Sequence, residues 1–261
     1  MPISLQHAIG YFGYILSAKT KHAVHSPFLF DFTTKVLNAE NSHPDFEKIE
    51  QIRTEMLNSN AVIAVEDFGA VEREKYTKKL SAIVQSAGKN AKYCKLLYRI
   101  IDFYQPQICL ELGTNTGISS MYQALGLKPE SHLFTVEGST ALAEIAKHNL
   151  DKLGIDNTQV VIAKFNDILP NMLSKLQRID YAFIDGNHTK TATIEYFEQI
   201  LPYCHGQTIL IFDDINWSSG MQTAWHTIKD HPAVKATVDL YFMGIVFFNE
   251  SLTKQEFTLR F

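Results

Sequence analysis

The sequence predicts an α/β fold: a doubly wound, mostly parallel sheet that follows a mainly helical N-terminal extension. From about residue 85 onward, short apolar runs alternate with segments of helix length, as in a sheet that carries helices on both faces. Near the end of the chain, two β-rich runs flank residues 242–244, a link too short for a helical crossover, so they should pair antiparallel. The composition of the 261 residues, 46% hydrophobic and 20% charged, is ordinary for a globular protein.

Residues 1–84 are expected to form an extension or lid, and residues 85–261 the main domain. The elements expected near the N-terminus are helices at 3–18 and 44–58, a short strand at 61–65 and a surface loop at 70–92. The loop is expected because that stretch has several lysines and no strong apolar period. The aromatic segment VHSPFLFDF at 24–32 is expected to dock its rings on the main domain.

Five parallel strands with apolar centres are expected in the main domain. They are the segments 107–111, 132–137, 159–163, 181–185 and 208–213. The helices expected between and after them are 117–127, 140–153, 168–177, 190–201 and 219–230. In the last of these helices, Met221, Ala224, Trp225 and Ile228 share one face, so core packing is expected for Trp225.

The stretch ELGTNTG, residues 111–117, stands between the first of these strands and the helix after it. Glycine is needed where the backbone takes unusual dihedrals or touches a ligand, and the free N–H groups of the helix start attract negative charge. A dinucleotide typically requires G-x-G-x-x-G, but Asn115 stands where that pattern has its second glycine. The Glu111 carboxylate would repel a pyrophosphate and suits the cationic end of S-adenosylmethionine.

ELGTNTG resembles the first motif, E-x-G-x-x-x-G, of class I S-adenosylmethionine-dependent methyltransferases, and the resemblance covers about residues 88–249. It implies a Rossmann-like seven-stranded sheet of order 3-2-1-4-5-7-6 with the last strand pair antiparallel. It also implies that the Glu137 carboxylate, at the end of the second strand, accepts hydrogen bonds from the ribose hydroxyls of the cofactor. The implied cofactor contacts are Glu111, Gly113, Thr114, Asn115, Gly117, Glu137, Ser139, Phe165 and Asp185. Lys164 stands where the family often has an acid close to adenine, so Asn166 and Asp167 are alternatives to Phe165 for the adenine contact. Thr114, Asn115 and Ser139 suit a turn equally well.

Two neighbouring strands end in acids, in YAFIDGNH and ILIFDDINW. Because ligands sit beyond the carboxyl ends of such strands, Asp185, Asp213 and Asp214 should converge, and a divalent cation would relieve their repulsion. The pattern resembles the catechol and caffeoyl-CoA O-methyltransferases, which implies that these three aspartates hold Mg²⁺ or another divalent cation. Position 214 is usually asparagine in that group, and His188 stands where catechol O-methyltransferases carry a catalytic lysine. His188, with Asp185, is therefore a candidate general base that needs no metal.

Trp217 follows the paired aspartates, and two interpretations of it remain. It either walls a flat acceptor by stacking or is buried against the helix at 219–230, and burial is the favoured expectation.

The predicted function is S-adenosylmethionine-dependent methylation of a small molecule on oxygen. The alternatives are a metal-independent N- or C-methyltransferase and a non-catalytic protein that binds the cofactor or a partner. A net charge of -4, no basic block and no D/N-P-P-Y/F tetrapeptide argue against nucleic acid as a partner.

The remaining expectations concern location and assembly. The chain shows no signal-peptide pattern and no long apolar run, so a cytoplasmic protein without membrane contact is expected, with a homodimer as a possibility. The three cysteines, Cys94, Cys109 and Cys204, form no C-x-x-C pair, so neither a disulfide framework nor a zinc site is indicated.

Overall fold

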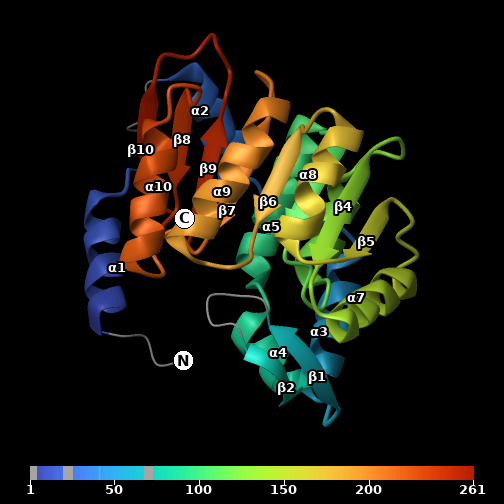
Figure 1. Ribbon diagram of the computed structural model, residues 1–261. Helices are drawn as coiled ribbons and strands as arrows, with labels where there is room; N and C mark the ends of the chain where they lie inside the picture. The colour runs from blue at the N-terminus through green and yellow to red at the C-terminus, as the bar shows by residue number, and fades with distance from the viewer. Residues whose placement is uncertain (1–4, 20–25, 41, 68–72) are drawn as a thin grey trace. The chain divides into compact units, whose positions relative to one another are not determined.

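The computed structural model describes residues 5–19, 26–40, 42–67 and 73–261 (Figure 1). Residues 24–25 of the aromatic segment and 70–72 of the expected loop lie outside the described residues. The chain divides into two compact units. The continuous unit is Asn38–Pro170, and the two-part unit joins Met1–Leu37 to Asn171–Phe261. The predicted domain boundary at residue 84 stays a prediction.

The continuous unit contains three parallel strands with a helix after each. The strands are β3 (Ile108–Leu112), β4 (His132–Glu137) and β5 (Thr158–Ile162), and β4 pairs with both of the others. The helices are α5 (Ala91–Tyr104), which precedes β3, then α6 (Ile118–Gly126), α7 (Thr140–Lys152) and α8 (Phe165–Leu176), whose last turns lie beyond Pro170. The register sets Leu112 beside Val136 and Glu137 beside Ile162, so the strands end at one edge. This edge is where the sequence places the glycine turn and Glu137.

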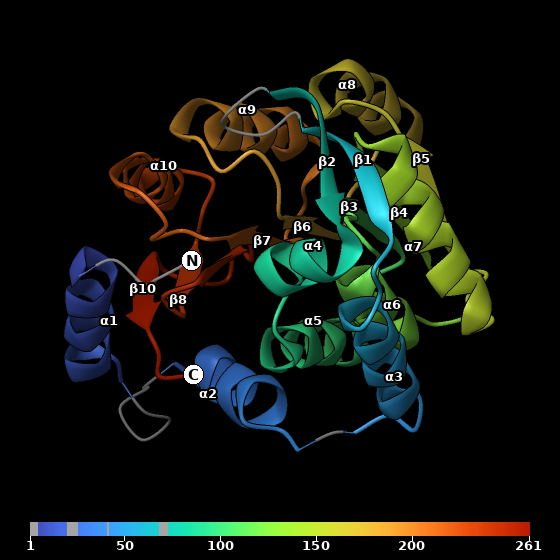
Figure 2. The ribbon, with the colours of Figure 1, turned by 90° about the horizontal axis from the view of Figure 1, so that it is seen from below.

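The first part of the continuous unit contains a hairpin that the sequence analysis did not expect. The hairpin consists of β1 (Val62–Asp67) and β2 (Arg73–Lys79). It lies in the chain between α3 (Phe46–Leu57) and α4 (Leu80–Ala87). The strand expected at 61–65 is confirmed as β1, but the expected loop at 70–92 is wrong. Antiparallel pairing with β1 turns the lysine-rich REKYTKK into β2, and buried Leu80, Ile83 and Val84 hold α4 in place. Figure 2 shows β1 running beside α7, which it contacts.

The two-part unit contains the other strands. They are β6 (Tyr181–Ile184), β7 (Ile209–Asp213), β8 (Ala236–Asp239), β9 (Met243–Phe247) and β10 (Gln255–Thr258), in the order β6-β7-β9-β8-β10. The predicted antiparallel pairing of the late strands is confirmed, since β9 runs antiparallel to both β7 and β8. The helices are α9 (Lys190–Ile200), the 3₁₀ turn η3 (Leu201–Tyr203) and α10 (Ser219–Asp230). The predicted order across the two units stays a prediction.

Trp225 on α10 packs on β9, as its apolar face predicts. Its side chain is 4% exposed. A Cβ atom on Gly244 would lie 2.7 Å from the Trp225 ring, so only glycine lets the strand approach the indole this closely.

The N-terminal helices of the two-part unit are α1 (Leu5–Ser17), α2 (Pro27–Phe32) and the π-helical turn η2 (Thr33–Leu37). Phe28 and Phe32 contact the Phe247 ring edge-on, with centroids 5.0 and 5.5 Å away, which confirms the predicted docking of these rings. Tyr14 donates a hydrogen bond to the carbonyl of Leu259 near the other end of the chain. Within the described ranges, none of the helices combines the length and apolarity needed to cross a membrane.

Candidate active site

The glycine turn between β3 and α6 has the unusual backbone that its sequence predicts. Gly113, Asn115 and Gly117 all have positive φ, at 108°, 51° and 82°. A Cβ atom on Gly117 would lie 3.1 Å from both Cα and Cβ of Ala146 on α7. Gly117 is therefore required by backbone conformation and by the close approach of α7, whether or not a ligand is bound.

Glu111 lies beneath this turn and has no exposed surface. Ser119 and Gln123 of α6 donate to its Oε1 over 2.7 and 2.6 Å, and Ser120 and Thr135 donate to its Oε2. Burial raises the pKa of Glu111, and the four hydrogen bonds partly oppose that rise. The carboxylate thus joins β3, β4 and α6, so we assign it to positioning the turn. The predicted direct contact of Glu111 with the cofactor stays a prediction.

Glu137 ends β4 and joins the loops after β3 and β4. Its Oε2 accepts the backbone N–H of Asn115 over 2.8 Å, and its Oε1 accepts that of Ser139 over 2.9 Å. Burial raises the pKa of Glu137, while these backbone hydrogen bonds oppose the rise. The backbone of Gly138 also interacts with this carboxylate, and because a carboxylate offers about four acceptor positions, one remains for a hydroxyl ligand.

The other predicted cofactor residues differ in whether their side chains already make hydrogen bonds within the protein. The Thr114 hydroxyl is 1% exposed and hydrogen-bonds the Thr135 hydroxyl over 2.6 Å, so it belongs to the Glu111 network. The Ser139 hydroxyl is fully buried and makes no hydrogen bond among the described residues, which leaves it available beside Glu137. Phe165 is half-buried at the start of α8, and its contact with the cofactor stays a prediction.

In the two-part unit, the residues after β6 and β7 bring a histidine between two carboxylates. His188 Nε2 lies 3.6 Å from Oδ1 of Asp185 and 3.9 Å from Oδ2 of Asp214. All three side chains are partly exposed, at 28%, 17% and 27%. Asp214 takes a positive φ of 52°, and its N–H donates to the carbonyl of Phe242 over 2.6 Å, which fixes the turn after β7.

The predicted metal-ligand set is not assembled in this geometry. Nowhere in the described part of the chain do three or more His, Cys, Asp or Glu side chains gather as metal ligands. Asp213 is the last residue of β7 and is 3% exposed, whereas Asp185 and Asp214 lie at ion-pair distance from His188. The residues present therefore fit a histidine held by two carboxylates better than a three-aspartate cation site.

The loops after β7 and β8 carry two exposed aromatic side chains, Trp217 and Phe242. Trp217 is 48% exposed, so its expected burial is wrong. Phe242 is 44% exposed and its ring lies 5.9 Å from that of Tyr11 on α1. Asn216 donates to the carbonyl of Tyr241 over 2.8 Å and so ties the two loops together. The sequence analysis placed Phe242 in the link between two β-rich runs and gave it no role, so this exposed ring was missed.

Comparison with known proteins agrees with this architecture. Residues 110–215 match the family described as a methyltransferase domain. A catechol O-methyltransferase of Niastella koreensis is 30% identical over 123 residues, 46% of this chain and 55% of that enzyme. A catechol O-methyltransferase of Mycobacterium tuberculosis is 27% identical over 156 residues, 59% of this chain and 68% of that enzyme. The chain thus aligns with only about half of the Niastella enzyme.

A solved structure gives the same result for the fold. The O-methyltransferase of Bacillus cereus in complex with SAH superposes with a TM-score of 0.57 at 20% identity, covering 84% of this chain and 97% of that one. At this identity the likeness shows a shared methyltransferase fold. Together with the family match and the glycine turn, it agrees with the resemblance seen in the sequence: residues 110–215 match a methyltransferase domain, the fold is that of a methyltransferase, and the relatives reported above are O-methyltransferases.

Proposed function

We propose that this chain transfers a methyl group from S-adenosylmethionine to an oxygen of a small-molecule acceptor. The names of its relatives, catechol O-methyltransferases, favour oxygen over nitrogen or carbon as the atom that is methylated. When bound, the cofactor supplies an electrophilic methyl group on a cationic sulfur. In this proposal Glu137 accepts the ribose hydroxyls and Ser139 adds its unpaired hydroxyl, while Glu111 holds the turn in place.

The observation that carries the proposal is the position of His188 between Asp185 and Asp214. A neutral imidazole nitrogen can take the proton of an acceptor hydroxyl, which makes the oxygen a better nucleophile. Two carboxylates facing that nitrogen then stabilise the positive charge that the ring gains. Asp185 and Asp214 act through His188 and are positioning residues.

The test is His188→Ala, assayed with a catechol as the probe acceptor. Loss of a general base lowers kcat by about a hundredfold to ten-thousandfold. The affinity for S-adenosylhomocysteine, measured by calorimetry, should stay unchanged, which separates lost chemistry from a misfolded protein. His226→Ala removes an exposed histidine of α10 and is the matched control. Full activity of the His188→Ala protein would contradict the proposed role.

A chelator separates this arrangement from a metal-assisted one. With His188 as the base, activity should survive EDTA. Loss of activity in EDTA with recovery on adding Mg²⁺ would replace it by the cation arrangement that the sequence resemblance implies. Cofactor binding without turnover of any acceptor would instead support the non-catalytic alternative. The cytoplasmic location and the homodimer stay predictions.

A further inference from the structure

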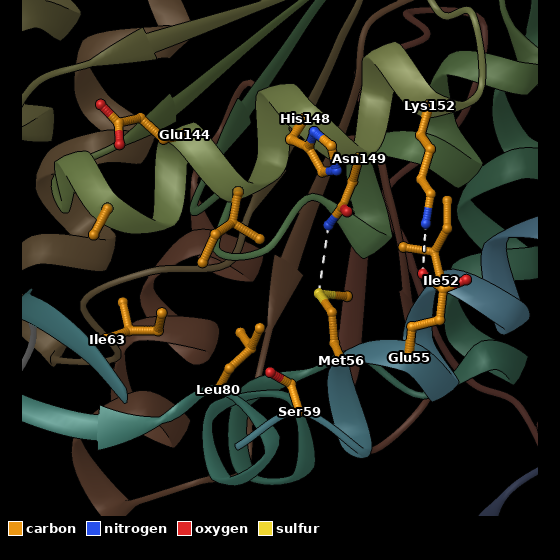
Figure 3. A pocket seen from close by; sticks show the side chains of 12 residues that line it. Ile52, Glu55, Met56, Ser59, Ile63, Leu80, Glu144, His148, Asn149 and Lys152 are labelled. Carbon is orange, nitrogen blue, oxygen red and sulfur yellow. Dashed lines mark hydrogen bonds and ion pairs between the residues drawn. The ribbon is translucent and has the colours of Figure 1, made fainter. Parts of the chain in front are cut away.

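The continuous unit contains a pocket of about 480 Å³ that none of the predicted site residues lines (Figure 3). It is formed by α3, the end of β1 nearest α3, the start of α4 and one face of α7. Its apolar lining consists of Ile52, Met56, Ile63, Leu80, Ala141 and Ile145, and its polar lining of Glu55, Ser59, Glu144, His148, Asn149 and Lys152. A volume of this size that combines apolar side chains with polar groups suits a small molecule.

The charges at this pocket leave one carboxylate uncompensated. Glu55 of α3 and Lys152 of α7 pair across it at 2.5 Å and neutralise each other. Glu144, also on α7, makes no hydrogen bond or ion pair with any described residue. His148 also lines the pocket, and with its imidazole neutral the described lining side chains carry a net negative charge, which complements an apolar molecule that carries one cationic group.

The wall of the pocket is joined to the glycine turn by one buried side chain. Asn149 of α7 is 4% exposed, and its Nδ2 donates to Sδ of Met56 over 3.4 Å and to the carbonyl of Thr116 over 2.9 Å. The close contact of Ala146 with Gly117 lies one turn earlier on the same helix. Thus α7 both lines the pocket and supports the turn, and Asn149 takes part in both.

We propose that this pocket binds a small molecule with an apolar body and one cationic amine, and that Asn149 couples its occupancy to the glycine turn. A ligand that packs on Met56 and pairs with Glu144 holds α3 against α7. Asn149 bonds both Met56 and Thr116. Local unfolding events that break the hydrogen bond to the turn therefore also disrupt the pocket, and they become rarer when the pocket is filled. The proposal makes this face of α7 an effector site, and its test does not depend on the enzyme having an acceptor.

The first test measures the binding of phenethylamine, phenethyl alcohol and phenylacetate to the full chain by NMR titration. The amine should bind more tightly than the alcohol by about 1.5-fold to fivefold, the range of an exposed ion pair, and the anion most weakly. Glu144→Lys should reverse this order, whereas Glu130→Lys, an exposed carboxylate outside the pocket, should preserve it. Equal binding of the three probes, or no binding of any, would overturn the proposal.

The second test measures hydrogen exchange of the backbone at 113–117. Some of this exchange occurs through local unfolding that also disrupts the pocket. With phenethylamine at about ten times its Kd, exchange by that route should slow by up to about elevenfold. Asn149→Ala removes both hydrogen bonds and should abolish the slowing, even with the amine at about ten times the Kd that the same NMR titration gives for this variant. Met56→Leu keeps the side-chain volume but removes the sulfur acceptor, so it should weaken the coupling in a protein that stays folded. Slowing that persists in Asn149→Ala, or its absence in the unaltered chain, would refute the coupling.

Discussion

Glu137 is the single residue whose predicted role can be tested most directly. Glu137→Gln keeps its shape, but the amide nitrogen then faces the N–H of Asn115 or of Ser139, a donor against a donor. The substitution also removes the negative charge of the carboxylate that would accept hydrogen bonds from the ribose hydroxyls. Since hydrogen bonds to a charged group contribute about 1.5–3 kcal/mol, the Kd for S-adenosylhomocysteine should rise by about tenfold or more. Calorimetry measures this change.

The matched control for Glu137→Gln is Glu130→Gln, which neutralises an exposed carboxylate and should leave the Kd unchanged. If both variants bound S-adenosylhomocysteine as the unaltered chain does, Glu137 would have only the loop-bridging role seen in its backbone contacts.

Sequence reasoning at the residue scale predicted the positions of some side chains but not all of their hydrogen-bond partners. The spacing of Asp185 and His188 predicted two side chains that the structure does bring together. Glu111 is the contrary case, because its four donors come from α6 and β4. Nothing next to Glu111 in the chain shows that Ser119, Ser120 and Gln123 turn inward. A local motif identifies an acidic residue, but it does not show which donors hydrogen-bond to its carboxylate oxygens.

At the scale of one element, α10 depends on its N-cap. The Ser218 hydroxyl accepts the N–H of Met221 over 3.1 Å, which satisfies one of the unpaired donors of the first turn. Ser218→Ala should lower the free energy of unfolding by about 1 kcal/mol, measured by urea denaturation. Ser219→Ala, one residue later, removes an exposed hydroxyl that caps nothing and should change the stability far less. Equal losses in the two variants would mean that the cap contributes nothing specific.

The elements that the sequence predicted are those whose pattern is local. The helix expected at 219–230 is confirmed at its bounds, because its apolar face and capping serine lie within the helix and its flank. In contrast, β2 and β10 were not expected. β2 is charged along most of its length and exists through its pairing with β1, and β10 pairs only with β8. Such strands depend on partners elsewhere in the chain, which a short window of sequence does not contain.

For the molecule as a whole, buried carboxylates set part of the pH dependence of stability. Burial raises the pKa of Glu111, Glu137 and Asp239 above the ordinary range, so the folded chain holds their protons more tightly than the unfolded chain does. Asp45 acts in the opposite direction, because its exposed ion pair with Lys48 lowers its pKa. The pH curve of the unaltered chain therefore mixes contributions of both signs, and a variant is needed to isolate one of them.

Glu111→Gln isolates the contribution of Glu111. A group with a raised folded pKa contributes stability that is fully present below its unfolded pKa, about 4.3 for glutamate, and that is lost as the pH rises through the folded pKa. The unaltered chain should therefore be most stable relative to Glu111→Gln in acid and lose this advantage toward neutral pH.

Replacing an acceptor-only group by an amide among four donors adds a penalty that does not vary with pH, so the slope of the difference is the diagnostic quantity. Urea denaturation of both proteins across this range measures it. Parallel curves would show that Glu111 titrates as it does in the unfolded chain, and a difference that grows with pH would mean that its hydrogen bonds outweigh its burial.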